Sequence, residues 1–270
     1  INDKNYISSI IRKNKISNIF HAAANKHVNI TEMNPLEAIK TNIFGTLNVL
    51  QVSKEYNVHL TIISTDKATA PKSLLGYTKR FSELLNLYVG HSKVNILRFG
   101  NVIASNGSAL PKWIQQVNNE EYITITSKKA KRYFMTINEA CYLVLNTCKL
   151  KIINKIFILN MGKQIRIINI IEELVRLKKL INPFYKPKFD IIGLQKGEKL
   201  IEKLSLNKKL YSTVIQNVYY VEEPTYAPKL IENAINSLKK FNINGYGKKS
   251  KILLQQFLNK KKWFYYILLY

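Results

Sequence analysis

Between residues 18 and 100, segments with a strand pattern alternate with segments with a helix pattern, and the connections are short. Short apolar runs typical of buried strands occupy residues 18–24 (NIFHAAA), 59–65 (HLTIIST) and 94–100 (VNILRFG). Strands that follow one another through single helices pair in parallel, because the crossover returns the chain in the same direction. We therefore predict an α/β fold with a doubly wound parallel sheet.

The first of these helices has a clear start signal. Asn34 can cap it, Pro35 occupies its first position, and Glu37 follows three residues after the cap. Apolar side chains then recur at helical spacing from Leu36 to Leu50, which predicts one buried face. Further helices are predicted at residues 76–91, 137–149 and 167–180, and a further strand at 155–160.

A length of 270 residues is enough for one large α/β domain with a smaller lobe. We assign residues 1–230 to this domain and expect its substrate lobe to be formed mainly by 111–230, where 181–230 is irregular. Residues 231–270 are predicted to be a basic C-terminal extension. The apolar and aromatic end, 263–270, could contact a membrane interface, but we favour a badly ordered terminus.

The formal net charge of +25 does not by itself indicate a partner. The lysines are scattered among Ile, Asn and Tyr, which favours a compositional bias of the genome over a selected basic surface. No zinc-finger spacing or aromatic RNA-binding motif accompanies them, so we expect no nucleic-acid partner. No apolar run approaches the roughly 18 residues that span a bilayer. Cys141 and Cys148 match neither a disulfide framework nor a metal site, which favours a reducing compartment and no metal.

Unusual residues follow the three predicted strands. Small side chains at 22–24 would let a flat cofactor approach the backbone, and Ser64 to Lys67 bring hydroxyl, carboxylate and ammonium groups to one point. Asn101 follows the third strand, and Lys79 comes early in the next helix. Each feature alone is common in structural roles. In a doubly wound sheet, however, ligands bind beyond the carboxyl ends of the strands, so together they predict an active site.

Several segments occur in an order that resembles one protein family: FHAAANKHV, NPLEAIKTNIFGTLNV, ISTDKA, GYTKR, RFGNV, KRYFMTINEA and LQKGEKL. This family is the capsular-polysaccharide and flagellin-glycosylation branch of the extended short-chain dehydrogenases/reductases, the UDP-N-acetylglucosamine 4,6-dehydratases. The resemblance covers about residues 1–225. It implies a modified NAD(P)-binding Rossmann fold, an NADP cofactor with NAD as the alternative, a UDP-sugar substrate, a homo-oligomer and a cytoplasmic location. Any association with the cytoplasmic face of the membrane would come from a missing N-terminal part.

The family's reaction implies roles for the strand-end residues. Hydride leaves C4 of the sugar, a base removes the C5 proton, the C6 hydroxyl departs as water, and hydride returns to C6. By resemblance Lys67 is the base and Asp66 the acid, while Thr65 bonds the C4 oxygen and Lys79 binds the nicotinamide ribose. The implied cofactor contacts are Ala22, Ala23, Ala24, Ser64 and Lys79, and the implied substrate contacts are Lys26, Asn101, Arg132 and Glu198.

Three departures from the family pattern stand out. Leu75 replaces the superfamily tyrosine four residues before Lys79, and Tyr77 is about 200° round the helix, so it cannot take that place. An apolar residue there is typical of the long, membrane-anchored members. Gln195 and Lys196 replace Arg-Pro, which removes a bidentate contact to nucleotide, and Asn106 replaces an arginine.

The third departure is the lack of a Gly-x-x-Gly-x-x-Gly loop, which normally holds the cofactor pyrophosphate. The first βαβ unit of the fold is expected to be missing, with one sheet edge exposed and weak cofactor binding. The sequence is then either a fragment or a truncated gene product. Besides the dehydratase reading, we weigh a nucleotide-sugar epimerase on the same fold and a non-catalytic remnant or partner-bound module. A basic RNA-binding protein is a distant third.

Overall fold

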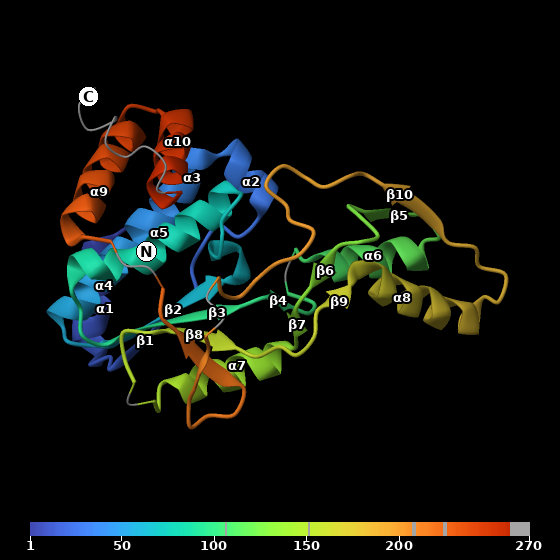
Figure 1. Cartoon of the computed structure of the whole chain (residues 1–270), viewed down its shortest axis with the longest axis horizontal. Helices are drawn as coiled ribbons and strands as arrows, with labels where there is room; N and C mark the ends of the chain where they lie inside the picture. The colour runs from blue at the N-terminus through green and yellow to red at the C-terminus, as the bar shows by residue number, and fades with distance from the viewer. Residues whose placement is uncertain (106, 151, 207–208, 224–225, 260–270) are drawn as a thin grey trace.

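A computed structural model describes residues 1–105, 107–150, 152–206, 209–223 and 226–259. Its centre is a six-stranded sheet in the order β1-β2-β3-β8-β12-β11 (Figure 1). The strands are β1 (Asn18–His21), β2 (His59–Thr65), β3 (Val94–Phe99), β8 (Ile156–Leu159), β12 (Val218–Val221) and β11 (Tyr211–Ser212). The first four are parallel, as predicted, and the last two run antiparallel. β1 lies at one edge, where Phe20 is exposed.

Helices cover both faces of this sheet, so the predicted α/β fold class is confirmed. On one face the largest core joins the sheet to α3, α4, α5, α9 and α10 through residues such as Ile39, Leu60, Phe81 and Leu238. On the other face α7 packs over β3 and β8. The helices are α1 (Lys4–Asn14), α2 (Val28–Met33), α3 (Pro35–Ile39), α4 (Thr46–Glu55), α5 (Leu74–Val89), α7 (Ile137–Thr147), α9 (Pro228–Ile243) and α10 (Gly247–Leu258).

The predicted first helix is not continuous. A π-helical segment, Lys40–Gly45, separates α3 from α4. The carbonyl oxygen of Asn42 in this segment accepts hydrogen bonds from the hydroxyls of Thr46 and Ser82. The Asn42 side chain binds the backbone of Asn25 and the hydroxyl of Thr78. The irregular turn therefore ties the end of β1 to α5.

A smaller lobe stands beyond the carboxyl ends of the parallel strands (Figure 1). Its core lies between α6 and α8 and the short sheet β5-β10, and it includes Trp113, Ile123 and Ile171. The elements are α6 (Ala109–Asn118), β5 (Tyr122–Ile125), α8 (Ile167–Ile181) and β10 (Lys188–Ile191). Two two-stranded pieces join the lobe to the main sheet, β4-β7 (Asn101–Val102, Phe134–Met135) and β6-β9 (Lys131–Arg132, Ile165–Arg166).

The chain crosses between the lobes more often than the residue order suggests. Within 111–230, the segments of the small lobe alternate with α7, β8, β11 and β12, which belong to the main sheet. Residues 181–230 are therefore not irregular throughout. The described part of 231–270 forms α9 and α10, and these helices contribute Leu238, Leu254 and Phe257 to the largest core. The boundary at residue 230 stays a prediction, and residues 263–270 lie outside the described part of the chain.

Three features are absent from the described residues. No helix among them is both long and apolar enough to cross a bilayer. No group of three or more His, Cys, Asp or Glu side chains in the same residues is placed to hold a metal ion. Cys141 and Cys148 form no disulfide.

Candidate active site

A cavity of about 570 Å³ opens where the parallel strands end, between the main sheet and the small lobe. Its lining includes ten of the residues that the sequence singles out: Ala22, Ala24, Lys26, Ser64, Thr65, Lys67, Lys79, Asn101, Arg132 and Glu198. Ala23 and Asp66 are not part of the lining. The three strand ends thus meet at one place, because parallel strands bring their carboxyl ends to the same edge of a sheet.

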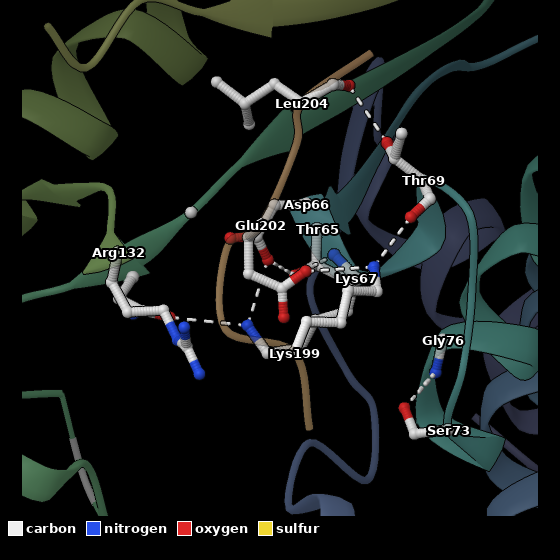
Figure 2. Close-up of polar contacts among 12 residues, drawn as sticks. Thr65, Asp66, Lys67, Thr69, Ser73, Gly76, Arg132, Lys199, Glu202 and Leu204 are labelled. Carbon is white, nitrogen blue, oxygen red and sulfur yellow. Dashed lines mark hydrogen bonds and ion pairs between the residues drawn. The ribbon is translucent and has the colours of Figure 1, made fainter. Parts of the chain in front are cut away.

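Thr65, Asp66 and Lys67 form a connected cluster at the end of β2 (Figure 2). The Thr65 hydroxyl and the Lys67 ammonium donate to the same oxygen, Oδ1 of Asp66, at 2.9 and 3.0 Å. Lys67 Nζ also lies 3.4 Å from Oδ1 of Asn101, which follows β3. A 3-10 turn, Asp66–Ala68, begins directly after the strand, and the Thr65 side chain caps it. This turn directs Lys67 into the cavity.

Asp66 lies behind this cluster rather than on the cavity surface. Its side chain is fully buried, and its Oδ2 has no hydrogen-bond partner among the described residues. Gly100 allows this position: a Cβ there would lie 3.2 Å from Oδ2 and 2.8 Å from the Cβ of Tyr133. The sequence places Asp66 correctly beside Lys67, but an acid acting on a ligand would need this carboxyl to turn toward the cavity.

Lys79 reaches the same cavity from α5. Its ammonium donates a 2.6 Å hydrogen bond to the carbonyl of Ile63 in β2. Burial lowers the pKa of Lys79 to about 8, although the nearby Glu83 carboxylate opposes this shift. Leu75, one turn earlier, lines the cavity, whereas Tyr77 packs in the main core. The expectation that Tyr77 cannot substitute for the superfamily tyrosine is therefore confirmed.

Ser64, which the sequence assigns to the cofactor, also belongs to a buried ionic network. Its hydroxyl donates to Oε1 of Glu83 at 2.6 Å. Glu83 accepts from Arg98, which is itself fully buried and also pairs with Glu223 at 2.6 Å. The two arginines of the network, Arg98 and Arg80, hold the pKa of Glu83 at about 2 against the effect of burial. This network joins α5, β3 and the segment after β12 beneath the cavity.

Arg132 and Glu198 both line the cavity, and they bind each other. The guanidinium Nη2 donates to Glu198 Oε1 at 2.7 Å, and Nη1 donates to the carbonyls of Lys131 and Leu200. Glu198 also accepts from the hydroxyl of Thr126. Arg132 is thus engaged in a largely buried ion pair, and a nucleotide would meet a guanidinium already bound by protein groups.

Glu198 belongs to a connecting segment, residues 195–204, that contacts both lobes (Figure 2). Lys199 Nζ donates to the carbonyl of Thr69 at 2.8 Å, and the Thr69 hydroxyl donates to the carbonyl of Leu204 at 3.1 Å. Gly197 has a φ of +84°, and a Cβ there would lie 2.7 Å from the Cβ of Ser73. The segment therefore fits closely against the loop between β2 and α5.

Two residues of the cavity lining and one buried histidine outside that lining were missed from the sequence. Lys112 of α6 lines the cavity, is exposed, and has no partner among the described residues. Trp113 beside it lines the cavity and donates to the carbonyl of Thr124. His21, buried at the end of β1, contacts Thr46 through Nε2 at 2.8 Å. Burial, with a smaller effect from the Lys79 charge, lowers the pKa of His21 to about 4. Helical periodicity in residues 109–118 could have indicated α6.

The remaining residues that the sequence singles out are not part of the Thr65-Asp66-Lys67 cluster. His27 lines the cavity as an exposed side chain, and so does Lys26, which makes further interactions within the chain. Gln195 donates its backbone N–H to Glu198. Asn106, noted for its departure from the family pattern, lies outside the described residues.

Comparison with known proteins gives one family and several relatives. The family described as "Polysaccharide biosynthesis protein" matches residues 1–223. The capsular polysaccharide biosynthesis protein CapD of Staphylococcus aureus is 35% identical over 89% of the chain, which spans 41% of CapD. A UDP-N-acetylglucosamine 4,6-dehydratase (inverting) of Campylobacter jejuni is 32% identical over 93% of the chain and is covered to 72%. A UDP-glucose 4-epimerase of Rickettsia bellii is 32% identical over 80% of the chain and is covered to 64%.

Solved structures share the fold. Pen from Bacillus thuringiensis is 27% identical, with a TM-score of 0.74 over 87% of the chain and 79% of Pen. The dTDP-glucose 4,6-dehydratase DesIV of Streptomyces venezuelae, solved with NAD bound, is 18% identical, with a TM-score of 0.63 over 75% of the chain and 68% of DesIV. The second likeness concerns the fold alone.

Proposed function

The chain belongs to the polysaccharide biosynthesis protein family of the extended short-chain dehydrogenases/reductases, and from this premise we propose that it is a nucleotide-sugar 4,6-dehydratase. The proposed substrate is UDP-N-acetylglucosamine, in the biosynthesis of surface polysaccharide or glycan. The observation that carries the proposal is the Thr65-Asp66-Lys67 cluster, which shares its cavity with Lys79 and Asn101.

A nicotinamide cofactor fits one side of this cavity. Ala22 and Ala24 line the cavity just after β1, and Lys79, which also lines it, is hydrogen-bonded to β2. We propose that these residues and Ser64 hold the nicotinamide end, with NADP as the cofactor and NAD as the alternative. When bound, this group would supply reversible hydride transfer. The sequence contains no Gly-x-x-Gly-x-x-Gly loop for the pyrophosphate, so the fit concerns the nicotinamide end only.

Lys67 is the proposed base for the C5 proton. A lysine must be neutral to accept a proton, so the proposed role requires Lys67 to release a proton before it acts. Asp66 is the proposed acid for the departing C6 hydroxyl. This role requires the carboxyl to turn toward the cavity, because its unpartnered Oδ2 is buried.

The remaining residues position the sugar and the nucleotide. Thr65 is proposed to bond the C4 oxygen, and Asn101 to hold both Lys67 and the substrate. Lys26 and Lys112 supply positive charge for the diphosphate, because Arg132 is already engaged with Glu198. A homo-oligomeric state and a cytoplasmic location stay predictions.

The test is product analysis with UDP-N-acetylglucosamine and NADP. For a reaction run in D₂O, we expect a 4-keto-6-deoxy sugar that carries deuterium from the solvent at C5. Lys67→Ala should lower turnover by about 10²-fold or more, because general-base catalysis contributes about that much, while UDP-sugar binding is retained. Lys129→Ala, which changes an exposed lysine absent from the cavity lining, is the control.

Three outcomes would contradict the proposal. A C4 epimer as the product would support the epimerase alternative, which is suggested by the similarity to the UDP-glucose 4-epimerase of Rickettsia bellii. Loss of UDP-sugar binding in Lys67→Ala, with unchanged turnover of the sugar that still binds, would remove the role of Lys67. A chain that binds UDP-sugar and cofactor together without any turnover would support the non-catalytic alternative.

A further inference from the structure

Four large apolar side chains are exposed together where α8 ends. Leu177, Leu180 and Ile181 are 49%, 72% and 84% exposed, and Phe184, just after the helix, is 89% exposed. Their spacing of three and four residues places the helical members on one side of α8. We call these four residues the apolar tip. Figure 1 shows that this end of α8 lies at the extremity of the small lobe, away from the main sheet.

The apolar tip is exposed on a firmly packed support. Ile167, Ile171 and Val175 bury the neighbouring side of α8 in the core of the small lobe, and Tyr185 is buried directly after Phe184. Glu120 holds the helix end, because it pairs with Lys178 and accepts from Asn182. These contacts keep the four side chains pointing outward, and none of the described residues buries them.

Basic residues flank the apolar tip in the sequence. Residues 176–188 (RLKKLINPFYKPK) contain five basic side chains and no acidic one. Arg176 and Lys178 pair with glutamates, but Lys179, Lys186 and Lys188 are exposed and form no ion pair among the described residues. Lys188 lies over the ring of Tyr122, which is itself largely exposed.

We propose that the apolar tip docks on an anionic lipid bilayer. Exposed leucine, isoleucine and phenylalanine side chains next to lysines are the combination that enters the headgroup region while the ammonium groups contact lipid phosphates. Because the apolar tip lies at the extremity of the small lobe (Figure 1), it can also contact the flat surface of a bilayer. A second copy of the chain fits less well, because symmetric contact through the tip would bring like charges together. The inference does not depend on the proposed enzymatic activity.

The experiment is co-sedimentation of the whole chain with vesicles. Vesicles of phosphatidylcholine with phosphatidylglycerol are compared with phosphatidylcholine alone. Because a net charge of +25 attracts any anionic surface, binding is measured at low salt and at about 0.5 M salt, where charge attraction is strongly screened. We expect preference for the anionic vesicles, with part of the binding retained at high salt through apolar contact. Equal binding to both vesicles, or no binding, would overturn the proposal.

A matched pair of variants isolates the apolar tip. The triple variant Leu180→Ser, Ile181→Ser, Phe184→Ser should bind anionic vesicles about tenfold or more weakly, since three large apolar side chains no longer leave water. The control changes three exposed apolar residues elsewhere, Tyr142→Ser, Leu145→Ser and Ile243→Ser, and should bind like the natural chain. Equal binding by the two triple variants would overturn the proposal.

A second measurement reports insertion directly. In Phe184→Trp, bromine-labelled acyl chains should quench the added tryptophan emission, and in Tyr142→Trp they should not. Absence of quenching in Phe184→Trp would overturn the docking geometry. Analytical ultracentrifugation without lipid tests whether a second copy of the chain occupies the apolar tip instead. If the chain self-associates, and the triple variant of the apolar tip abolishes this self-association but binds vesicles unchanged, the surface belongs to a second copy.

Discussion

Lys67 and Asp66 are adjacent in the chain, yet only one of them reaches the cavity. The strand ends at Thr65 and the chain enters a 3-10 turn, so consecutive side chains no longer alternate as in a strand. Lys67 points into the cavity, and Asp66 is fully buried behind it. The proximity of these two groups could be predicted from their order, but their depths depend on Gly100 and Tyr133, which the fold brings against the turn.

The buried His21 gives a prediction on stability at the residue scale. Its pKa is about 4 in the fold and about 6.5 in the unfolded chain. Between these values the unfolded state binds more protons, so the free energy of unfolding decreases as pH falls from 6.5 toward 4. At pH 5 the loss due to His21 should be about 2 kcal/mol.

This loss is measured by urea unfolding at pH 7 and pH 5. His21→Gln, which can still hydrogen-bond Thr46 but does not titrate, is compared with the natural chain. The natural chain should lose more stability on acidification than the variant by about that amount. Equal losses in both proteins would show that His21 is not kept neutral by the fold.

At the scale of elements, α5 holds the site together. It carries Lys79, it bears Glu83 of the buried ionic network, and its Phe81 packs against Phe257 of α10 with ring centroids 5.3 Å apart. The ring of Tyr226 stacks on the same Phe257. The position of Lys79 thus depends in part on a helix near the end of the described chain, which no strand-end motif indicates.

The role of α10 is tested by removing its aromatic anchor. Phe257→Ala should lower the free energy of unfolding by about 3–5 kcal/mol, because it leaves a cavity among buried rings. Ile252→Ala, on the exposed side of the same helix, should change it by less than about 1 kcal/mol. Chemical denaturation of the two variants measures the difference. A small effect for Phe257→Ala would mean that α10 does not contribute to the main core.

At the scale of the whole molecule, the cavity exists because two lobes meet across residues 195–204. This segment binds Thr69 beside the main sheet and Arg132 in the small lobe. Its backbone must turn through a left-handed conformation at Gly197 while it lies against Ser73. The spacing of the two lobes, and with it the width of the cavity, therefore depends on this contact.

Two glycines of similar backbone conformation allow the cost of backbone strain to be measured apart from the cost of disturbing the contact between the lobes. Gly193 and Gly197 have φ of +76° and +84°, but a Cβ at Gly193 would meet nothing within 4 Å. Gly193→Ala should cost about 1–2 kcal/mol through strain alone. Gly197→Ala should cost about 1–3 kcal/mol more, because the methyl group would overpack against Ser73.

Urea unfolding measures both costs, and calorimetry with UDP measures the effect on the site. We expect weaker UDP binding in Gly197→Ala than in Gly193→Ala, since Glu198 and Arg132 follow the displaced segment. Equal stability and equal affinity in the two variants would contradict the role given to this contact.

Local spacing in the amino-acid sequence was sufficient for the parallel strands, the helices between them and the meeting of three strand ends. Those features depend on residues a few positions apart and on the handedness of crossovers. Contacts between distant residues were decided only in the folded chain. Four features join segments that are far apart in sequence. They are the pairing of Arg132 with Glu198, the burial of Asp66, the antiparallel pairing of β12 with β8, and the packing of α10 on α5. Such contacts form because apolar surface and buried charge are stable only when other parts of the chain cover or pair with them. The spacing of residues along the chain does not predict which distant segment does so.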